Sequence, residues 1–194
     1  MPEHGHGRRC RHVLPALVLA AAASASRATE IGDACHAALP ESLAAALERQ
    51  FPAYRTPLAT DNDPADVAEN LRRGGSGCLG LASADLDGDG VTDYVVGLAP
   101  RAGLQPLALI ALARGGQWVF HLIESGVGVR SRLFVDVVPP GRYDRSESLG
   151  PPQAADDQRQ LTCPIAGAIV GAAHATGIVH CLVRGSWRRV TVAG

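Results

Sequence analysis

The chain has 194 residues, 46% of them hydrophobic, and its 18 basic and 19 acidic residues give a net charge of −1 at pH 7. Every basic residue in that count is an arginine, and the arginines are scattered along the chain, which argues against the basic stripe of a nucleic-acid-binding surface. The length suits one domain with a substantial core.

The first 25 residues have the pattern of a cleaved secretory signal peptide. Three arginines at positions 8–11 precede an apolar run, Val13 to Ala23, and the small residues at 23–25 fit the signal-peptidase rule. Because a stable transmembrane helix needs about 20 apolar residues, this run is too short to be one, and a hydrophobic anchor helix is the alternative. We expect residues 26–194 to form a single periplasmic or secreted domain with no membrane span.

Cleavage would leave four cysteines in an oxidising compartment, and an even number favours two disulfides. Four cysteines allow three pairings, and sequence alone does not fix the choice. The two clusters of cysteines along the chain favour Cys35–Cys78 and Cys163–Cys181. Four buried free thiols are the alternative, whereas the spacings do not fit a zinc site, whose cysteines lie two to four residues apart.

Two helices are expected before the first cluster of strands. Residues 40–51 repeat apolar side chains at a helical spacing, with Pro40 suited to the first turn and Pro52 following the end. In the segment "DNDPADVAENLRRGG", Asp63 is a plausible N-cap, Pro64 takes the first helical position and Gly74 ends the helix.

From Cys78 onward the hydrophobic period is that of β-strands. Short apolar or alternating runs occupy residues 78–84, 93–99, 107–113, 118–124, 132–138, 166–174, 177–184 and 187–193. Gly185-Ser186, between the last two, is expected to form a hairpin turn. Helices followed by strands with short connections predict an α+β fold, in which N-terminal helices pack on a mainly antiparallel β-sheet. The longest polar stretch, residues 139–158, is expected to be a surface loop.

The segment "SADLDGDGVTDYVVGLA", residues 83–99, places four aspartates within nine positions directly before an apolar strand. With Asp85 as position 1, carboxylates fall at positions 1, 3, 5 and 9, and Gly90 holds position 6, where a calcium loop turns sharply. Position 12 is Val96 rather than the bidentate glutamate of an EF-hand, and it lies in a strand-like run. The pattern predicts a Ca²⁺ loop between two strands, and a metal-free acidic turn is the alternative.

This loop resembles the FG-GAP and VCBS repeats of secreted and cell-surface proteins, whose core Asp-x-Asp-Gly-Asp-Gly-x-x-Asp precedes an apolar strand. The resemblance implies calcium ligands at Asp85, Asp87, Asp89, Val91 (through its carbonyl) and Asp93. It covers about twenty residues in a single copy, whereas a propeller needs several blades, so it implies the loop and not the propeller. The layout is also similar to small secreted bacterial proteins of unassigned function with one such loop in an α+β domain.

The sequence favours a non-catalytic domain with a structural Ca²⁺. It contains no Gly-x-Ser-x-Gly elbow, no paired zinc histidines and no phosphate-binding glycine loop. His121 and His180 lie in strand-like runs, where a histidine is usually a packed or surface residue. Two alternatives stay open: a secreted hydrolase with a site assembled from dispersed residues, and an extracellular binding or inhibitor module using residues 139–158 toward a protein or glycan ligand.

Overall fold

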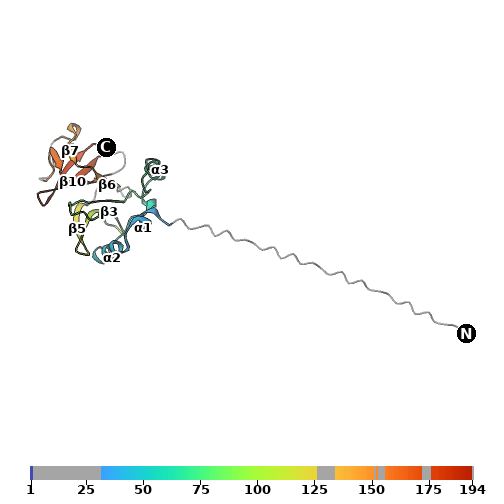
Figure 1. The fold of residues 1–194 in the computed structure, drawn as a ribbon. Helices are drawn as coiled ribbons and strands as arrows, with labels where there is room; N and C mark the ends of the chain where they lie inside the picture. Colours follow the sequence, from blue (N-terminus) through green and yellow to red (C-terminus); the bar gives the residue numbers. More distant parts are fainter. Residues whose placement is uncertain (2–31, 126–133, 151, 153–155, 172–175, 194) are drawn as a thin grey trace. The chain divides into compact units, whose positions relative to one another are not determined.

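Strands dominate the described part of the chain, and they pair antiparallel in three sheets (Figure 1). The computed structural model describes residues 1, 32–125, 134–150, 152, 156–171 and 176–193. Apart from Met1, the predicted signal peptide lies outside the described residues. Among the residues that are described, no helix is long and apolar enough to cross a membrane.

Two larger sheets and one two-stranded sheet account for these strands. The first sheet has the order β1-β3-β4-β5, with β2 also paired on β3, and comprises β1 (Tyr54–Arg55), β2 (Leu81–Ala84), β3 (Asp93–Pro100), β4 (Leu107–Arg114) and β5 (Gln117–Ser125). The second has the order β11-β10-β9-β6 and comprises β6 (Phe134–Val138), β9 (Gly167–Gly171), β10 (Gly177–Val183) and β11 (Ser186–Val192). The third pairs β7 (Gly141–Asp144) with β8 (Gln160–Cys163).

The helices are few and short, and the two predicted ones are present. They are α2 (Glu41–Gln50) and α3 (Pro64–Arg72), while α1 (Ala34–Ala38) and two 3₁₀ turns, η1 (Ala59–Asp61) and η2 (Glu147–Leu149), were not expected. As predicted, Asp63 caps α3, and its Oδ1 accepts a hydrogen bond from the Ala65 N–H at 2.9 Å. Pro40 is the N-cap of α2 rather than a first-turn residue.

The central strands β3 and β4 are buried on both faces, because alternate residues of a strand point to opposite sides. One set packs with Leu43 and Leu47 of α2 in a first cluster, to which the two strands contribute Val96, Leu98, Leu109 and Ala111. The other set packs toward the second sheet, in a second cluster that includes Val95, Ala108, Ile110, Leu112, Val135, Ala168 and Val170.

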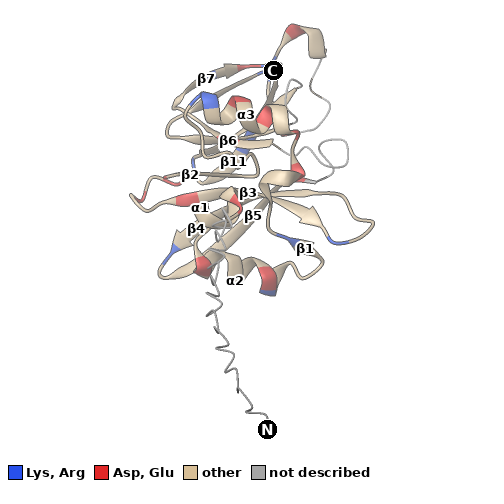
Figure 2. Ribbon diagram, turned by 90° about the vertical axis from the view of Figure 1, so that its right-hand side faces the viewer, with Lys and Arg blue, Asp and Glu red and all other residues tan. Residues whose placement is uncertain are grey.

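A third cluster lies between the second sheet and β8, and contains Leu161, Cys163, Val179, Cys181 and Val190. Figure 1 shows α2, the first sheet, the second sheet and β7 following one another across the domain, and each cluster fills a contact between neighbours in that row. Every residue of α3, by contrast, is at least partly exposed. Figure 2 shows the arginine positions, in blue, spread over several elements of the described chain.

Both expected disulfides are present. Cys35 of α1 bonds Cys78, which lies shortly before β2, and Cys163 of β8 bonds Cys181 of β10. The pairing that the cysteine clusters favoured is confirmed. Two disulfides indicate an oxidising environment of the extracellular type.

Two local predictions are wrong. The stretch 139–158 is not an uninterrupted loop, because it contains β7, which pairs with β8 through backbone hydrogen bonds that a polar sequence can also make. The last hairpin turns at Arg184-Gly185, one residue earlier than predicted, since Val183 pairs with Ser186. Both turn residues have positive φ, +51° and +76°, as a two-residue turn matched to the strand twist requires.

We expect the longer disulfide loop to contribute more to stability. Replacing both Cys35 and Cys78 by serine should lower the free energy of unfolding by about 4 kcal/mol, and the Cys163/Cys181 pair by about 3, because loop-closure entropy grows with the separations of 43 and 18 residues. Urea unfolding of the oxidised proteins measures both losses. Thiol labelling of the denatured, unreduced protein cleaved after residue 25 should find almost no free cysteine, and four labelled thiols would contradict the bonds.

Asp61 holds the segment that leads into α3. Its carboxylate accepts hydrogen bonds from Arg55 Nη1 and Nη2 at 2.7 and 2.5 Å and from the Leu58 N–H at 2.9 Å. Burial by itself raises the pKa of Asp61, but the Arg55 and Leu58 hydrogen bonds and the Arg55 charge outweigh it, so the pKa lies below its ordinary value.

Because the pKa of Asp61 is lower in the folded state, its contribution is complete above the unfolded pKa of about 3.9 and is lost as the pH falls through the folded value. Asp61→Asn should therefore lower the free energy of unfolding by about 1–2 kcal/mol at pH 7. The difference from wild type should shrink below about pH 4. Urea unfolding at pH 7 and pH 3 measures it, and an equal loss at both would refute the assignment.

Candidate metal centre

The predicted calcium ligands lie in a short loop between the antiparallel strands β2 and β3. Ala84 and Asp93 form the last pair of this hairpin, so residues 85–92 make the connection. Gly88 and Gly90 have φ of +81° and +85°, a left-handed conformation that side chains disfavour. The two glycines let the backbone turn so that aspartate side chains gather within the loop.

Asp85, Asp87 and Asp89 form the three-carboxylate cluster of this loop. One possible ligand oxygen from each lies within 4.8 Å of the others. Backbone N–H groups of the loop fix these side chains: Gly88 and Gly90 donate to the two oxygens of Asp85 at 2.7 and 2.9 Å. The Asp89 N–H donates to Asp87 Oδ1 at 3.2 Å. The carboxylates are therefore positioned by the loop itself.

Arg114, at the end of β4, supplies a positive charge to the cluster. Its Nε and Nη2 both donate to Asp87 Oδ2, at 2.9 and 2.7 Å. The Asp87 side chain is only 4% exposed, whereas that of Arg114 is 52% exposed. Solvent around the guanidinium screens the pair, so it offsets part of the repulsion among the three carboxylates without cancelling it.

Asp93, the fourth aspartate, is fully buried and lies outside the three-carboxylate cluster. Its Oδ2 accepts from the Leu86 N–H and its Oδ1 from the Ala113 N–H, both at 2.9 Å. Burial raises the pKa of Asp93, the two N–H groups oppose that rise, and the nearby charges of Asp87 and Asp89 add to it. In this structure the carboxylate ties the loop to β4.

Val91 completes the set of five predicted ligands. Its N–H donates to Asp89 Oδ1 at 2.8 Å, and the residue is 47% exposed. The structure thus brings three of the predicted side chains together, places Val91 next to them and turns Asp93 toward backbone donors. The donor set consists of oxygens, which suit a hard cation such as Ca²⁺ better than a soft one.

A second polar group, which the sequence did not reveal, joins β5 of the first sheet to β10 and β11 of the second. Glu124 of β5 lies 2.8 Å from Arg189 Nη1 and 3.2 Å from His180 Nε2 through the same oxygen, Oε1. Glu124 and His180 are 8% and 4% exposed. His180 and Arg189 are a cross-strand pair of β10 and β11, so both can face one carboxylate. The sequence feature that could have indicated this group is Glu124, a glutamate near the end of an apolar strand.

A groove of about 750 Å³ lies beside α3 and takes its walls from β2, β6 and the ends of β9, β10 and β11. Its described lining residues include the carboxylates Asp66, Glu69 and Asp136 but no histidine. His180 and Glu124 are buried elsewhere, so in the described chain this histidine does not converge with the groove's carboxylates.

We expect Glu124→Gln to destabilise the protein strongly. The change removes the carboxylate that Arg189 Nη1 and His180 Nε2 face and leaves Arg189 with Asp156, 3.3 Å from its Nε; losing a hydrogen bond to a charged group costs about 1.5–3 kcal/mol. The exposed α2 residue Glu48 provides the control, since Glu48→Gln should change the free energy of unfolding by less than about 0.5 kcal/mol. Urea unfolding at pH 7 compares the two, and equal stabilities would contradict a structural role for Glu124.

Comparison of the chain with protein-family models, with curated proteins and with solved structures finds no match, and the case for a function is therefore carried by the residues themselves.

Proposed function

We propose that this chain is a secreted or periplasmic α+β domain that binds one Ca²⁺ in the loop from Asp85 to Asp93, and that the ion is a structural clip. The observation that carries the proposal is the cluster of Asp85, Asp87 and Asp89, whose ligand oxygens come within 4.8 Å of one another. Three carboxylates at that distance repel, and a divalent cation removes the repulsion.

The ligands in this proposal are oxygens of Asp85, Asp87 and Asp89, the carbonyl of Val91 and the carboxylate of Asp93. Ca²⁺ takes six to eight oxygen ligands in flexible geometry, so water would complete the shell. Asp93 would have to exchange at least one of its backbone N–H partners for the ion. The chemistry that the ion supplies is charge neutralisation and a fixed loop geometry, without a role in catalysis.

The proposed affinity is weak. The loop lacks the bidentate glutamate of an EF-hand, and Arg114 places a competing positive charge on Asp87. We expect a Kd of roughly 10⁻⁴–10⁻³ M, the range of extracellular calcium modules. Such a site fills where calcium is millimolar, which accords with the predicted signal peptide and with the two disulfides.

A structural clip predicts calcium-dependent stability. In 10 mM CaCl₂, a site with a Kd of about 0.1–1 mM that exists only in the folded state should stabilise the protein by about 1.4–2.7 kcal/mol. The melting temperature should then be about 3–10 °C higher than in chelator. Thermal unfolding followed by circular dichroism measures the shift, and isothermal titration calorimetry measures the affinity.

Variants distinguish calcium binding at this site from a general effect of salt on the melting temperature. Asp89→Asn keeps an acceptor for the Val91 N–H but removes a ligand charge, and should abolish most of the shift. Arg114→Gln should raise the calcium affinity several-fold, because the competing charge is gone. Glu48→Gln is the control and should behave as wild type. Equal melting temperatures in chelator and in calcium, with no heat of binding, would reject the proposal.

A further inference from the structure

Among the described residues, one backbone hydrogen bond joins the edge of β6 to the residues just before β2, and the two strands do not pair beyond it. The Val135 N–H of β6 donates to the Leu79 C=O, just before β2, at 2.9 Å. Within the described residues, β2 pairs only with β3 and β6 pairs only with β9. In the part of the chain that the structure describes, one side of each strand therefore has no strand partner along the rest of its length.

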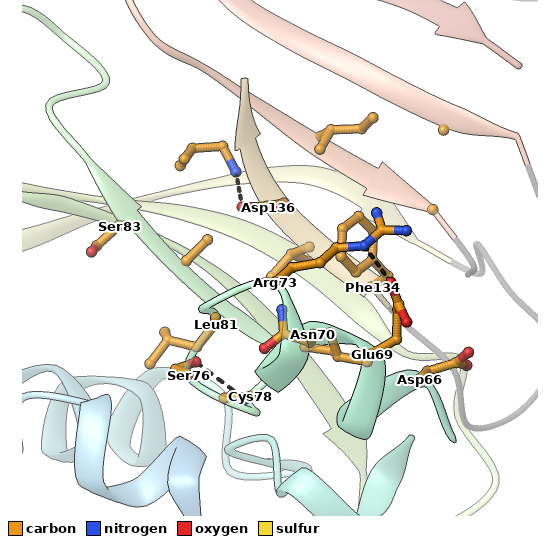
Figure 3. Close-up of a pocket in the computed structure, with 18 of the residues that line it drawn as sticks. Asp66, Glu69, Asn70, Arg73, Ser76, Cys78, Leu81, Ser83, Phe134 and Asp136 are labelled. Atoms are coloured by element: carbon orange, nitrogen blue, oxygen red, sulfur yellow. Dashed lines mark hydrogen bonds and ion pairs between the residues drawn. The ribbon is translucent and has the colours of Figure 1, made fainter. Parts of the chain in front are cut away.

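The groove beside α3 lies between these two edges (Figure 3). Residues 81–83 of β2 and 134–137 of β6 line it consecutively. Because successive side chains of a strand point to opposite faces, a cavity against one face would contact alternate residues. Contact with consecutive residues means that the groove runs along the strand edges, where the backbone groups are.

The register shows which backbone groups face the groove. The Gly97 N–H donates to the Gly80 C=O, so Gly80 points toward β3, and by alternation Leu81 and Ser83 direct their N–H and C=O groups away from it. The Val135 N–H points away from β9, toward Leu79, and Val137 of the same strand must do likewise.

A side-chain carboxylate, rather than the carbonyl of a neighbouring strand, accepts the hydrogen bond of the Val137 N–H. This N–H donates to Oδ1 of the neighbouring residue Asp136 at 2.7 Å, as the dashed line in Figure 3 marks. The Asp136 side chain is exposed at the groove. A backbone donor that would pair with a further strand is thus held by an exposed carboxylate, which can turn away when a better acceptor arrives.

The lining defines what could occupy the groove. The lining includes apolar residues of four strands, Leu81, Val135, Ile169 and Val192, of which Leu81 and Val135 are buried in the core clusters. Among the described residues, its charged lining consists of three acids and one arginine: Asp66, Glu69, Asp136 and Arg73. Figure 3 shows Glu69 of α3 beside Arg73, which follows the end of that helix, and Asp136 on β6. Arg73 pairs with Glu69 at 2.5 Å, so its charge is taken up there rather than by Asp136.

We propose that this groove binds an extended peptide segment of a partner protein, which adds as a strand to the free edges of β2 and β6 and places a basic side chain at Asp136. Backbone hydrogen bonds to Leu81, Ser83 and Val137 supply the affinity, and alternate apolar side chains of the peptide occupy the groove. A peptide carbonyl replaces the Asp136 carboxylate as the acceptor of the Val137 N–H. The released carboxylate then forms an ion pair with the basic side chain of the peptide. This binding is independent of the calcium loop.

Two blocked heptapeptides test the proposal by isothermal titration calorimetry with the purified full chain. Both alternate Val and Thr, with Lys at the centre of one and Glu at the centre of the other. The Lys peptide should bind with a Kd below 1 mM and at least about tenfold more tightly than the Glu peptide. N-methylation of either alternate set of peptide nitrogens should weaken binding, and by at least about tenfold for the set that faces β2, because one set faces the β2 edge at Leu81 and Ser83 and the other faces the β6 edge at Val137.

Variants and hydrogen exchange locate the binding. Asp136→Asn, which keeps an acceptor for the Val137 N–H, should weaken the Lys peptide about threefold to tenfold, whereas Glu48→Gln should leave it unchanged. Amide exchange at Leu81, Ser83 and Val137 should slow when the peptide binds. Absence of binding up to 1 mM, equal binding of both peptides, or indifference to N-methylation would overturn the proposal, and so would an unchanged affinity in Asp136→Asn.

Discussion

The burial of β3 and β4 on both faces is the constraint on which the rest of the structure depends. An antiparallel sheet commonly packs one face and exposes the other to water. Here the Val95 side of β3 belongs to the cluster shared with the second sheet, and the Val96 side belongs to the cluster shared with α2. If these two strands separate, both clusters lose the side chains that β3 and β4 contribute to them. At about 1.5–3 kcal/mol for each buried aliphatic side chain, this central pair is a main source of stability.

The aspartate loop between β2 and β3 takes its geometry from that same pair. Asp93 is the first residue of β3, and its buried carboxylate bonds the Ala113 N–H near the end of β4. Arg114, the next residue of β4, reaches Asp87 in the loop. The loop is thus supported by two deeply buried strands, while Asp85 and Asp89 accept hydrogen bonds from backbone N–H groups of the loop itself.

β2 connects the two proposed sites without being central to the core. Its carboxyl end leads into the aspartate loop, and its unpaired edge forms one side of the groove beside α3. The opposite side is β6, from the second sheet. The groove exists because two sheets meet there at a single hydrogen bond, Val135 to Leu79, and because the partly exposed α3 covers one side of it. Neither condition involves the metal ligands.

Local chemistry determined what the sequence by itself could predict. The cap at Asp63, the positive φ of Gly88 and Gly90 and the gathering of three aspartates depend on residues within a few positions of one another. The apolar runs likewise identified most strands, although a polar strand such as β7 carried no such signal and was expected to be loop.

Only the tertiary structure decided the interactions between distant segments. Asp93 fitted the ligand pattern, yet its carboxylate bonds Ala113, twenty residues away, because strand pairing brings that N–H beside it. Glu124, His180 and Arg189 come from different strands, and no local spacing relates them. The meeting of the β2 and β6 edges depends on how two sheets pack. Packing between elements distant in sequence is set by complementary surfaces, which exist only once the strands have formed.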